Sequence, residues 1–388
     1  GEPGPARAVY AETMMPLLEY RFSELRALRQ GRLKYIDAPT PELYDLGSDP
    51  GETRNLHHER AIEEESLAES LRGFVDASGD AAGSDANRGI DEATEAKLRS
   101  LGYISAGTPD VPTDGRGRDP KQMTDYFTRH GAANQAFMDD RFDDGIAILR
   151  ELVAEAPENF MMHYHIGSAL LADERFAEAE REFDVVVTAA PRFSAAYRLL
   201  ARSQDGQGKL DAAIASYRAA ADVSPNSGRP LAALGAMLES WGRFDEAAEA
   251  YRAAIDREPR SADFARHLRE LHQGRGDLDG AEAELRACAE RHAGSAALWT
   301  ETAVAARAAG RPNDALDALR RALDLVPGHV DALLEIGGIQ LAAGSAEVAE
   351  TAYRRAIEHA PDRSDAALGL GRALLAQDRA SEAMAALD

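Results

Sequence analysis

A 34-residue spacing through the second two-thirds of this chain constrains its fold more than any other feature. Seven positions recur at that interval, and six of them are proline: Pro157, Pro191, Pro225, Pro259, Ala293, Pro327 and Pro361. Proline ends a helix and redirects the chain. A constant period of this length therefore predicts stacked copies of one small helix-turn-helix unit.

The units also share small residues at the place where two packed helices would cross. On the first helix these are Ala133, Gly167, Ala201, Gly235, Ala303, Gly337 and Gly371, and on the second helix Gly145, Ala179, Ala213, Ala247, Ala281, Ala315, Ala349 and Ala383. Larger residues stand between them, at Leu149, Phe183, Tyr217, Tyr251, Leu285, Leu319 and Tyr353. Small residues let two helix backbones approach, and the larger ones fill the remaining space.

This pattern resembles the tetratricopeptide repeat (TPR). Aligned on the prolines, the copies span 126–159, 160–193, 194–227, 228–261, 262–295, 296–329 and 330–363, with a partial eighth at 364–388. The resemblance implies a right-handed superhelix of helix-turn-helix units. We therefore expect a mainly α fold, with a TPR α-solenoid over residues 121–388 that holds seven full repeats and a partial eighth.

The fifth repeat departs from the pattern. Arg269 occupies the small position, Cys288 replaces an alanine found in other copies, and Ala293 replaces the proline. A large charged side chain at a helix crossing must swing outward or separate the two helices. We expect a loosened contact within 262–295, as a degenerate folded copy or as a functional hinge.

The overall charge argues against two classes of partner. The net charge is -23 with a pI near 4.9, so nucleic acid and anionic membranes would be repelled at long range. No apolar stretch approaches the roughly 18 to 20 residues of a membrane span. The single cysteine, Cys288, excludes an internal disulfide. A protein or peptide remains the expected partner, and the oligomeric state is left open.

Before the repeats, residues 1–56 show alternation with a period near two. The pattern predicts short strands at Ala8–Glu12, Leu25–Arg29 and Leu33–Asp37, the last two joined by a Gln30-Gly31 turn. A fourth extended piece, Glu42–Leu46, precedes an Asp49-Pro50-Gly51 turn. Fifty-six residues bury too little surface to fold comfortably alone, so we expect the edge of a larger domain.

Residues 57–120 read as an acidic linker with short helices. The stretch 57–96 carries eleven acidic side chains against three arginines. Apolar spacing predicts a helix over Glu63–Phe74, anchored by Leu67, Leu71 and Phe74, and another over 90–103; flexible linkers are expected at Ser78–Asn87 and Gly107–Pro120.

Three stretches of the first 56 residues resemble the C-terminal end of the sulfatase family, within the alkaline-phosphatase superfamily. They are Tyr10-Ala11-Glu12-Thr13, Leu28–Ile36, and Glu42–Leu56 with its Asp49-Pro50-Gly51-Glu52 turn. The resemblance implies a small antiparallel sheet packed on a catalytic domain that would precede Gly1. It also implies calcium and formylglycine in that missing domain, and a periplasmic or exported protein. The chain is expected to be cut at both ends.

No catalytic residue of that family can be assigned here. Its nucleophile lies in Cys/Ser-x-Pro-x-Arg, whereas Cys288 is followed by Ala-Glu-Arg and Ser224-Pro225 is a repeat junction. His57 and His58 have no evident third ligand in the sequence, and three or four ligands are usual for a metal. We therefore expect no catalytic residue, no metal and no cofactor in this chain.

The first helices of such repeats line a concave groove, and the corresponding residues here are candidates for peptide binding. They are Phe127, Asn134, Met161 and Tyr164 in an apolar early zone, followed by Arg198, Arg202, Arg229 and Arg266. Arginines can grip a carboxylate or a sulfate with two hydrogen bonds. The alternative is a solvated face with local ion pairs.

Together these observations predict the C-terminal fragment of a sulfatase-like hydrolase, itself non-catalytic, whose TPR array mediates protein–protein interaction. The parent would hydrolyse a sulfuric ester. Two alternatives stay open: a TPR scaffold with no enzymatic role, and a parent that is a phosphoesterase or phosphonate hydrolase of the same superfamily.

Overall fold

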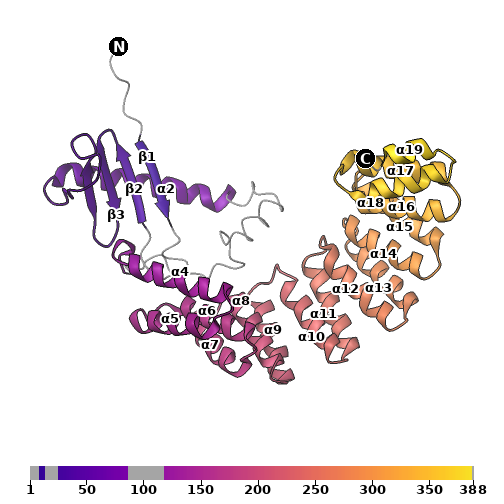
Figure 1. The fold of residues 1–388 in the computed structure, drawn as a ribbon, viewed down its shortest axis with the longest axis horizontal. Helices are drawn as coiled ribbons and strands as arrows, with labels where there is room; N and C mark the ends of the chain where they lie inside the picture. The colour runs from indigo at the N-terminus through magenta and orange to yellow at the C-terminus, as the bar shows by residue number, and fades with distance from the viewer. Residues whose placement is uncertain (1–7, 14–24, 86–117, 387–388) are drawn as a thin grey trace, which may run out of the picture. The chain divides into compact units, whose positions relative to one another are not determined.

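The computed structural model describes residues 8–13, 25–85 and 118–386 (Figure 1). The chain forms two compact units, Gly1–Ser216 and Tyr217–Asp388. Helices make up most of the described residues, and a small sheet precedes them. The prediction of a mainly α fold with a small N-terminal β segment is confirmed.

The sheet of the first unit is an antiparallel meander of four strands in the order β1-β2-β3-β4. The strands are β1 Ala8–Thr13, β2 Leu25–Gln30, β3 Leu33–Asp37 and β4 Glu42–Asp45, each where the alternation predicts it. Gln30 pairs with Leu33, so Gly31 and Arg32 form a two-residue turn. Gly31 has a φ of 63°, a conformation that glycine adopts without strain.

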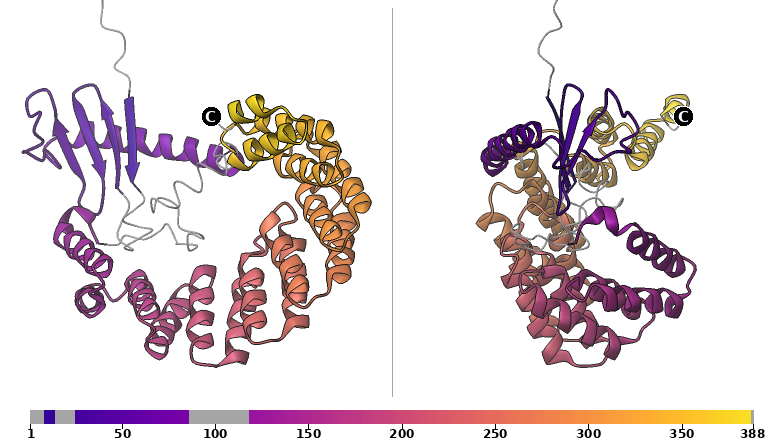
Figure 2. Two further views of the ribbon diagram at one scale, coloured as in Figure 1. Left: turned by 45° about the vertical axis from the view of Figure 1, so that its right-hand side comes forward. Right: turned by 90° about the vertical axis from the view of Figure 1, so that its left-hand side faces the viewer.

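One face of the sheet is buried because three apolar residues align across neighbouring strands. Leu28 pairs with Tyr35, and Tyr35 pairs with Leu43. Leu67 and Leu71 of helix α2, Ala61–Asp85, complete this core. They are four residues apart and lie on one face of the helix. Figure 2 shows α2 beside the sheet.

The segment 57–120 differs from the expected linker. Residues Ala61–Asp85 form one helix of 25 residues, so the predicted linker at Ser78–Asn87 falls largely within it. Alanine at positions 77, 81 and 82 favours a continued helix. Phe74, expected as an anchor, is 41% exposed. The expected helix at 90–103 and most of the linker at 107–120 lie outside the described residues.

The sheet is tied to the start of the repeats by a polar cluster around η1, Pro120–Gln122. Asp119 is buried and accepts hydrogen bonds from the backbone N–H groups of Lys121 at 3.0 Å and Thr40 at 3.3 Å. The Lys121 ammonium lies 2.8 Å from the Glu42 carboxylate and donates to the Thr40 carbonyl at 2.6 Å. These bonds connect the sheet and the first repeat within one unit.

Paired helices follow one another from residue 124 onward, as the 34-residue period predicts. The first helices of the pairs are α4 Thr124–Met138, α6 Phe160–Ala172, α8 Ser194–Asp205, α10 Arg229–Ser240, α12 Ala262–Gly274, α14 Ala296–Ala308, α16 Val330–Ala342 and α18 Ser364–Leu375. The second helices are α5 Phe142–Glu155, α7 Phe176–Ala189, α9 Leu210–Asp222, α11 Phe244–Arg257, α13 Leu278–Arg291, α15 Pro312–Leu325, α17 Ala346–His359 and α19 Ala380–Ala385. The boundary between the two units falls within α9.

The turn between the two helices of each pair repeats one backbone conformation. A residue with positive φ recurs every 34 residues, at Asp140, Glu174, Gly208, Gly242, Gly276, Gly310, Gly344 and Asp378. Glycine takes this conformation freely, whereas a residue with a side chain is strained by it. Five of the eight turns therefore carry glycine, and the other three accept some strain.

In several pairs the residues at the helix crossing are matched in size. A Cβ added at Gly337 would lie 2.6 Å from Cζ of Tyr353, and one added at Gly235 would lie 2.7 Å from Cε1 of Tyr251. Where the second helix carries a leucine instead, at Leu149 or Leu319, the matching residue of the first helix is alanine. The glycines make room for aromatic rings.

The fifth repeat is loosened, as predicted. Helices α12 and α13 lie less closely together than those of the pairs α4–α5, α6–α7, α10–α11, α14–α15 and α16–α17. The Arg269 side chain lies largely buried against α14: its Nε donates to Glu301 Oε2 at 2.8 Å, and another guanidinium nitrogen donates to Gln273 Oε1 of its own helix at 2.8 Å. Its charge is thus satisfied by the following repeat instead of its own second helix.

Ion pairs join consecutive repeats. In three places a basic residue before or at the start of a second helix reaches a glutamate 29 residues earlier: Lys209 to Glu180 at 2.6 Å, Arg311 to Glu282 at 3.0 Å and Arg379 to Glu350 at 2.7 Å. Glu350 also accepts from the Gln377 amide at 2.7 Å. These bonds hold the pKa of Glu350 below its usual range, and the hydrogen bond from Gln377 has the largest effect.

Candidate peptide-binding groove

The apolar residues predicted for the groove serve mainly as core in the first unit. Met161 is buried at 6% exposure, and Phe127 and Tyr164 pack partly buried against the same cluster. The Tyr164 ring lies 5.1 Å from the Phe193 ring, centroid to centroid. Asn134 is exposed on α4. Of this zone, Asn134 and the outer edges of the two rings remain accessible to a ligand.

The first two predicted arginines are brought together on α8. Arg198 and Arg202 are one turn apart and so share a helix face. Arg202 is exposed and Arg198 is half-buried. Burial raises the pKa of Tyr164, and the nearby positive charge of Arg198 acts in the opposite direction.

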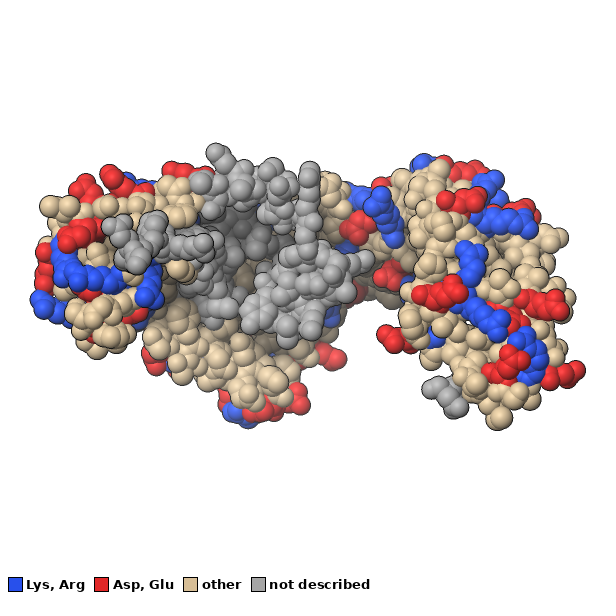
Figure 3. Space-filling view, turned by 90° about the horizontal axis from the view of Figure 1, so that it is seen from above, with Lys and Arg blue, Asp and Glu red and all other residues tan. Residues whose placement is uncertain are grey.

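The other two predicted arginines belong to the second unit. Arg229 is exposed at the start of α10, and Arg266 forms an ion pair with Asp263 at 2.6 Å. On the face shown in Figure 3, basic and acidic side chains stand next to one another over the described repeats. Local ion pairs of this kind fit the alternative interpretation, a solvated face. That the eight candidate residues form one peptide-binding groove stays a prediction.

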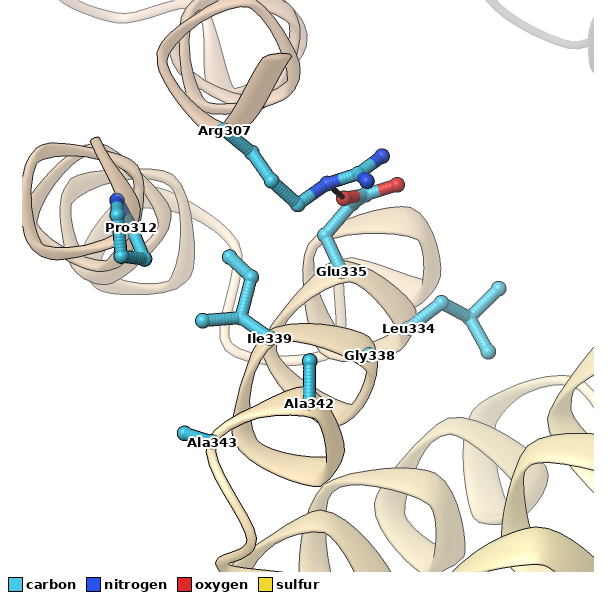
Figure 4. A pocket seen from close by; sticks show the side chains of 8 residues that line it. All are labelled: Arg307, Pro312, Leu334, Glu335, Gly338, Ile339, Ala342 and Ala343. Atoms are coloured by element: carbon cyan, nitrogen blue, oxygen red, sulfur yellow. Dashed lines mark hydrogen bonds and ion pairs between the residues drawn. The ribbon is translucent and has the colours of Figure 1, made fainter. Parts of the chain in front are cut away.

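A pocket of about 460 Å³ lies in the second unit, between the end of α14, the start of α15 and α16 (Figure 4). Its lining is Arg307, Pro312, Leu334, Glu335, Gly338, Ile339, Ala342 and Ala343. This volume falls within the range of small-ligand sites. None of these residues was among the predicted candidates.

The hollow arises from the sequence of α16. Leu334, Gly338 and Ala342 are four residues apart, so they line one face of the helix. Gly338 and Ala342 contribute almost no side chain to that face. A Cβ added at Gly338 would meet only Tyr353 Oη, at an ordinary 3.8 Å. Close packing therefore does not require this glycine, unlike its neighbour Gly337.

An ion pair lies at the rim of the pocket. Arg307 Nε donates to Glu335 Oε2 at 2.9 Å, and the Arg307 side chain is 49% exposed. Exposed ion pairs contribute little to stability, so a competing carboxylate can displace one at small cost. The arrangement can accept an apolar side chain below and a carboxylate or carbonyl above. Two successive glycines where the helix crossing needs only one were the sequence signal for it.

The described residues hold one further group of potential ligands. Glu64 lies next to His57 and His58, although the sequence offered no evident third ligand for that pair. Cys288 is buried, and burial raises the pKa of its thiol, which disfavours the nucleophilic thiolate. Among the described helices, none combines the length and apolar character needed to cross a bilayer.

Stacked helix pairs with a recurring turn and size-matched crossings define an α-solenoid repeat protein. Two family models described as "Tetratricopeptide repeat" match, one at residues 132–192, 181–228, 198–262 and 300–357, the other at 241–303 and 340–388. Together they span residues 132 to 388. The chain belongs to the tetratricopeptide repeat family.

Comparison with solved structures finds matches at low identity. The APC/C hetero-tetramer Cut9-Hcn1 is 20% identical over 73% of this chain, with a TM-score of 0.34, and this chain spans 52% of that one. YrrB, titled a TPR protein with an unusual peptide-binding site, is 18% identical over 47% of this chain and 95% of its own, with a TM-score of 0.31. A repeat protein from Parabacteroides merdae ATCC 43184 is 13% identical over 64% and 98%, with a TM-score of 0.36. No curated protein matches the sequence.

Proposed function

We propose that the repeat array binds an extended segment of a partner protein, and that the pocket formed by α14, α15 and α16 receives one apolar side chain of it. The observation that carries the proposal is the pocket itself, which has an apolar floor of Leu334 and Ile339 under the Arg307–Glu335 pair. Peptide-recognition grooves combine apolar pockets for side chains with a few polar groups that fix orientation.

The charges of the pocket and of the whole protein restrict the composition of the ligand. Arg307 can exchange Glu335 for a carboxylate of the peptide, since both ends of the present pair reach solvent. The protein's net charge of -23 repels a strongly acidic partner at a distance. A segment with one carboxylate near an apolar residue satisfies both conditions.

A substitution that fills the pocket tests this function. An array of random decapeptides would be probed with the full chain, and the tightest peptides measured by fluorescence anisotropy. Gly338→Leu should weaken binding by about 10-fold or more, because burial of one aliphatic side chain is worth about 1.5 to 3 kcal/mol. Gly131→Leu is the matched control, since Gly131 is an exposed helical glycine with nothing within 4 Å of an added Cβ. Equal affinity of the two variants and the parent would refute the proposal.

A second candidate concerns the segment before the repeats. We propose that residues 1–56 end a sulfatase-like domain whose catalytic part precedes them, so that the parent hydrolyses a sulfuric ester. Support comes from the resemblance and from the antiparallel strands β1 to β4, which lie where that resemblance implies. The matching family models begin only at residue 132.

The reading frame upstream of Gly1 tests the second candidate. A Cys-x-Pro-x-Arg segment about one domain earlier supports a sulfatase, and a different nucleophile motif supports a phosphoesterase or phosphonate hydrolase. A start codon close to Gly1 leaves the scaffold without enzymatic role. The chain alone, incubated with an aryl sulfate and calcium, should release no sulfate.

A further inference from the structure

Two histidines and a glutamate converge beside the N-terminal sheet. One ligand atom from each of His57, His58 and Glu64 can be chosen so that all three lie within 4.8 Å of one another. The histidines lie in the loop between β4 and α2, and Glu64 lies in the first turn of α2. The three side chains thus join two elements that pack on the same core.

The loop places both imidazole rings on one side. Asn55 Oδ1 accepts hydrogen bonds from the backbone N–H of Leu43 at 3.0 Å and of His57 at 2.9 Å, which fixes the loop to β4. His58 has a φ of 65°, a strained conformation for a residue with a side chain. The ring centroids of His57 and His58 are 3.6 Å apart. Side chains of consecutive residues in extended backbone would point to opposite sides.

The glutamate is held in position by both histidines. His57 Nδ1 lies 2.8 Å from Glu64 Oε1, and the backbone N–H of His58 donates to Glu64 Oε2 at 3.1 Å. The side chains of His57 and Glu64 are only 20% and 15% exposed. Since Leu67 and Leu71 fix α2 on the sheet, the carboxylate has little freedom to move away. A cation would find its ligands already gathered.

We propose that His57, His58 and Glu64 bind one Zn²⁺ ion. Two imidazole nitrogens and one carboxylate oxygen form a ligand set typical of zinc, whereas Mg²⁺ and Ca²⁺ prefer oxygen alone. Binding through Nδ1 replaces the His57–Glu64 hydrogen bond with two metal–ligand bonds, and the proton of His57 Nδ1 passes through solvent to Nε2, so that the imidazole stays neutral. Water fills the fourth position. The ion fastens the start of α2 to the loop after β4, and so reinforces a core of few residues.

The test uses the full chain without a polyhistidine tag, freed of metal by a chelator. Titration with ZnCl₂ in a calorimeter should give one ion per chain. His58→Asn should weaken binding at least 10-fold, because it removes one ligand while asparagine tolerates the positive φ. His163→Asn is the matched control: His163 also pairs with a glutamate, Glu182 at 2.7 Å, but on the repeats. Its affinity for Zn²⁺ should equal that of the parent chain.

Two further measurements keep the outcome clear. Glu64→Gln retains the side-chain shape and should also lower the affinity at least 10-fold, with helicity by circular dichroism unchanged. Zn²⁺ should slow amide hydrogen exchange over residues 61–76 in the parent chain and not in His58→Asn. Equal Zn²⁺ affinity of the parent, His58→Asn and Glu64→Gln overturns the proposal, and so does the absence of a bound ion in the parent.

Discussion

Gly337 and Gly338 are adjacent on α16, yet the structure predicts opposite effects when each becomes alanine. A Cβ at Gly337 would lie 2.6 to 2.8 Å from three ring carbons of Tyr353. Real Cβ contacts keep about 3.4 Å or more, so the ring or the helix must shift. A Cβ at Gly338 would be in ordinary contact at 3.8 Å.

The magnitudes follow from two competing effects. Alanine is more favourable than glycine inside a helix by about 1 kcal/mol, and this gain applies equally to both positions. Overpacking of a close-packed crossing costs about 1 to 3 kcal/mol and applies to Gly337→Ala alone. The free energies of unfolding of the two variants should therefore differ by about 1 to 3 kcal/mol, with Gly338→Ala more stable than the parent.

The crossing can be relieved by a second substitution. Tyr353→Leu recreates the alanine–leucine pair seen at Ala133 with Leu149 and at Ala303 with Leu319. In Gly337→Ala/Tyr353→Leu the combined cost should be smaller than the sum of the single costs by about 1 kcal/mol or more.

Native-state hydrogen exchange of α16 and α17 measures these differences locally, which suits an array that need not unfold in one step. Equal stabilisation by Gly337→Ala and Gly338→Ala, or strict additivity in the double variant, would show that the ring does not limit the approach of the helices.

Three other outcomes are expected. Replacing Arg198, Arg202 and Arg229 together with alanine should abolish capture of an acidic peptide in a pull-down, and undiminished capture would reject their role in the groove. Glu350 has a lowered pKa, so its stabilisation is present above about pH 4.5 and is lost as the pH falls through the lower folded-state value. Glu350→Gln should therefore flatten the acid dependence of amide protection factors around α17, which correct exchange rates for their intrinsic pH dependence; equal protection factors in the parent at pH 6 and pH 3 would contradict this. Glu174→Gly should raise the free energy of unfolding by about 0.5 kcal/mol, since strain at its φ of 57° exceeds the entropy cost of glycine. Denaturant unfolding measures this change, and a lower free energy of unfolding in the variant would contradict it.

The repeats were predictable because their signals are local and recur. Proline at the end of a second helix and a small residue at a crossing, such as Gly235, meet steric requirements of the backbone, and both can be recognised directly in the sequence. Alternation likewise located the four strands. The length of α2 was not predictable, because its packed residues Leu67 and Leu71 end well before the helix does.

The candidate sites were harder to predict because they depend on contacts between elements. Position within a repeat selected Met161, but the sequence did not show that neighbouring side chains bury it. The pocket at Gly338 requires α14 and α16 to meet, and the ligand set at His57 requires α2 to pack on the sheet. Spacing along the chain predicted which repeats are neighbours, but not which side chains such contacts bring together.

The loosened fifth repeat limits the cooperativity of unfolding along the array. In a solenoid, cooperativity passes only between adjacent repeats, so the weakest pair sets how far an opening spreads. Because α12 and α13 approach each other less closely than most other pairs, and Arg269 bonds to Glu301 of the next repeat, local unfolding should begin there and stop at its neighbours. Unfolding of the repeats on one side of the fifth repeat therefore need not spread to the repeats on the other side.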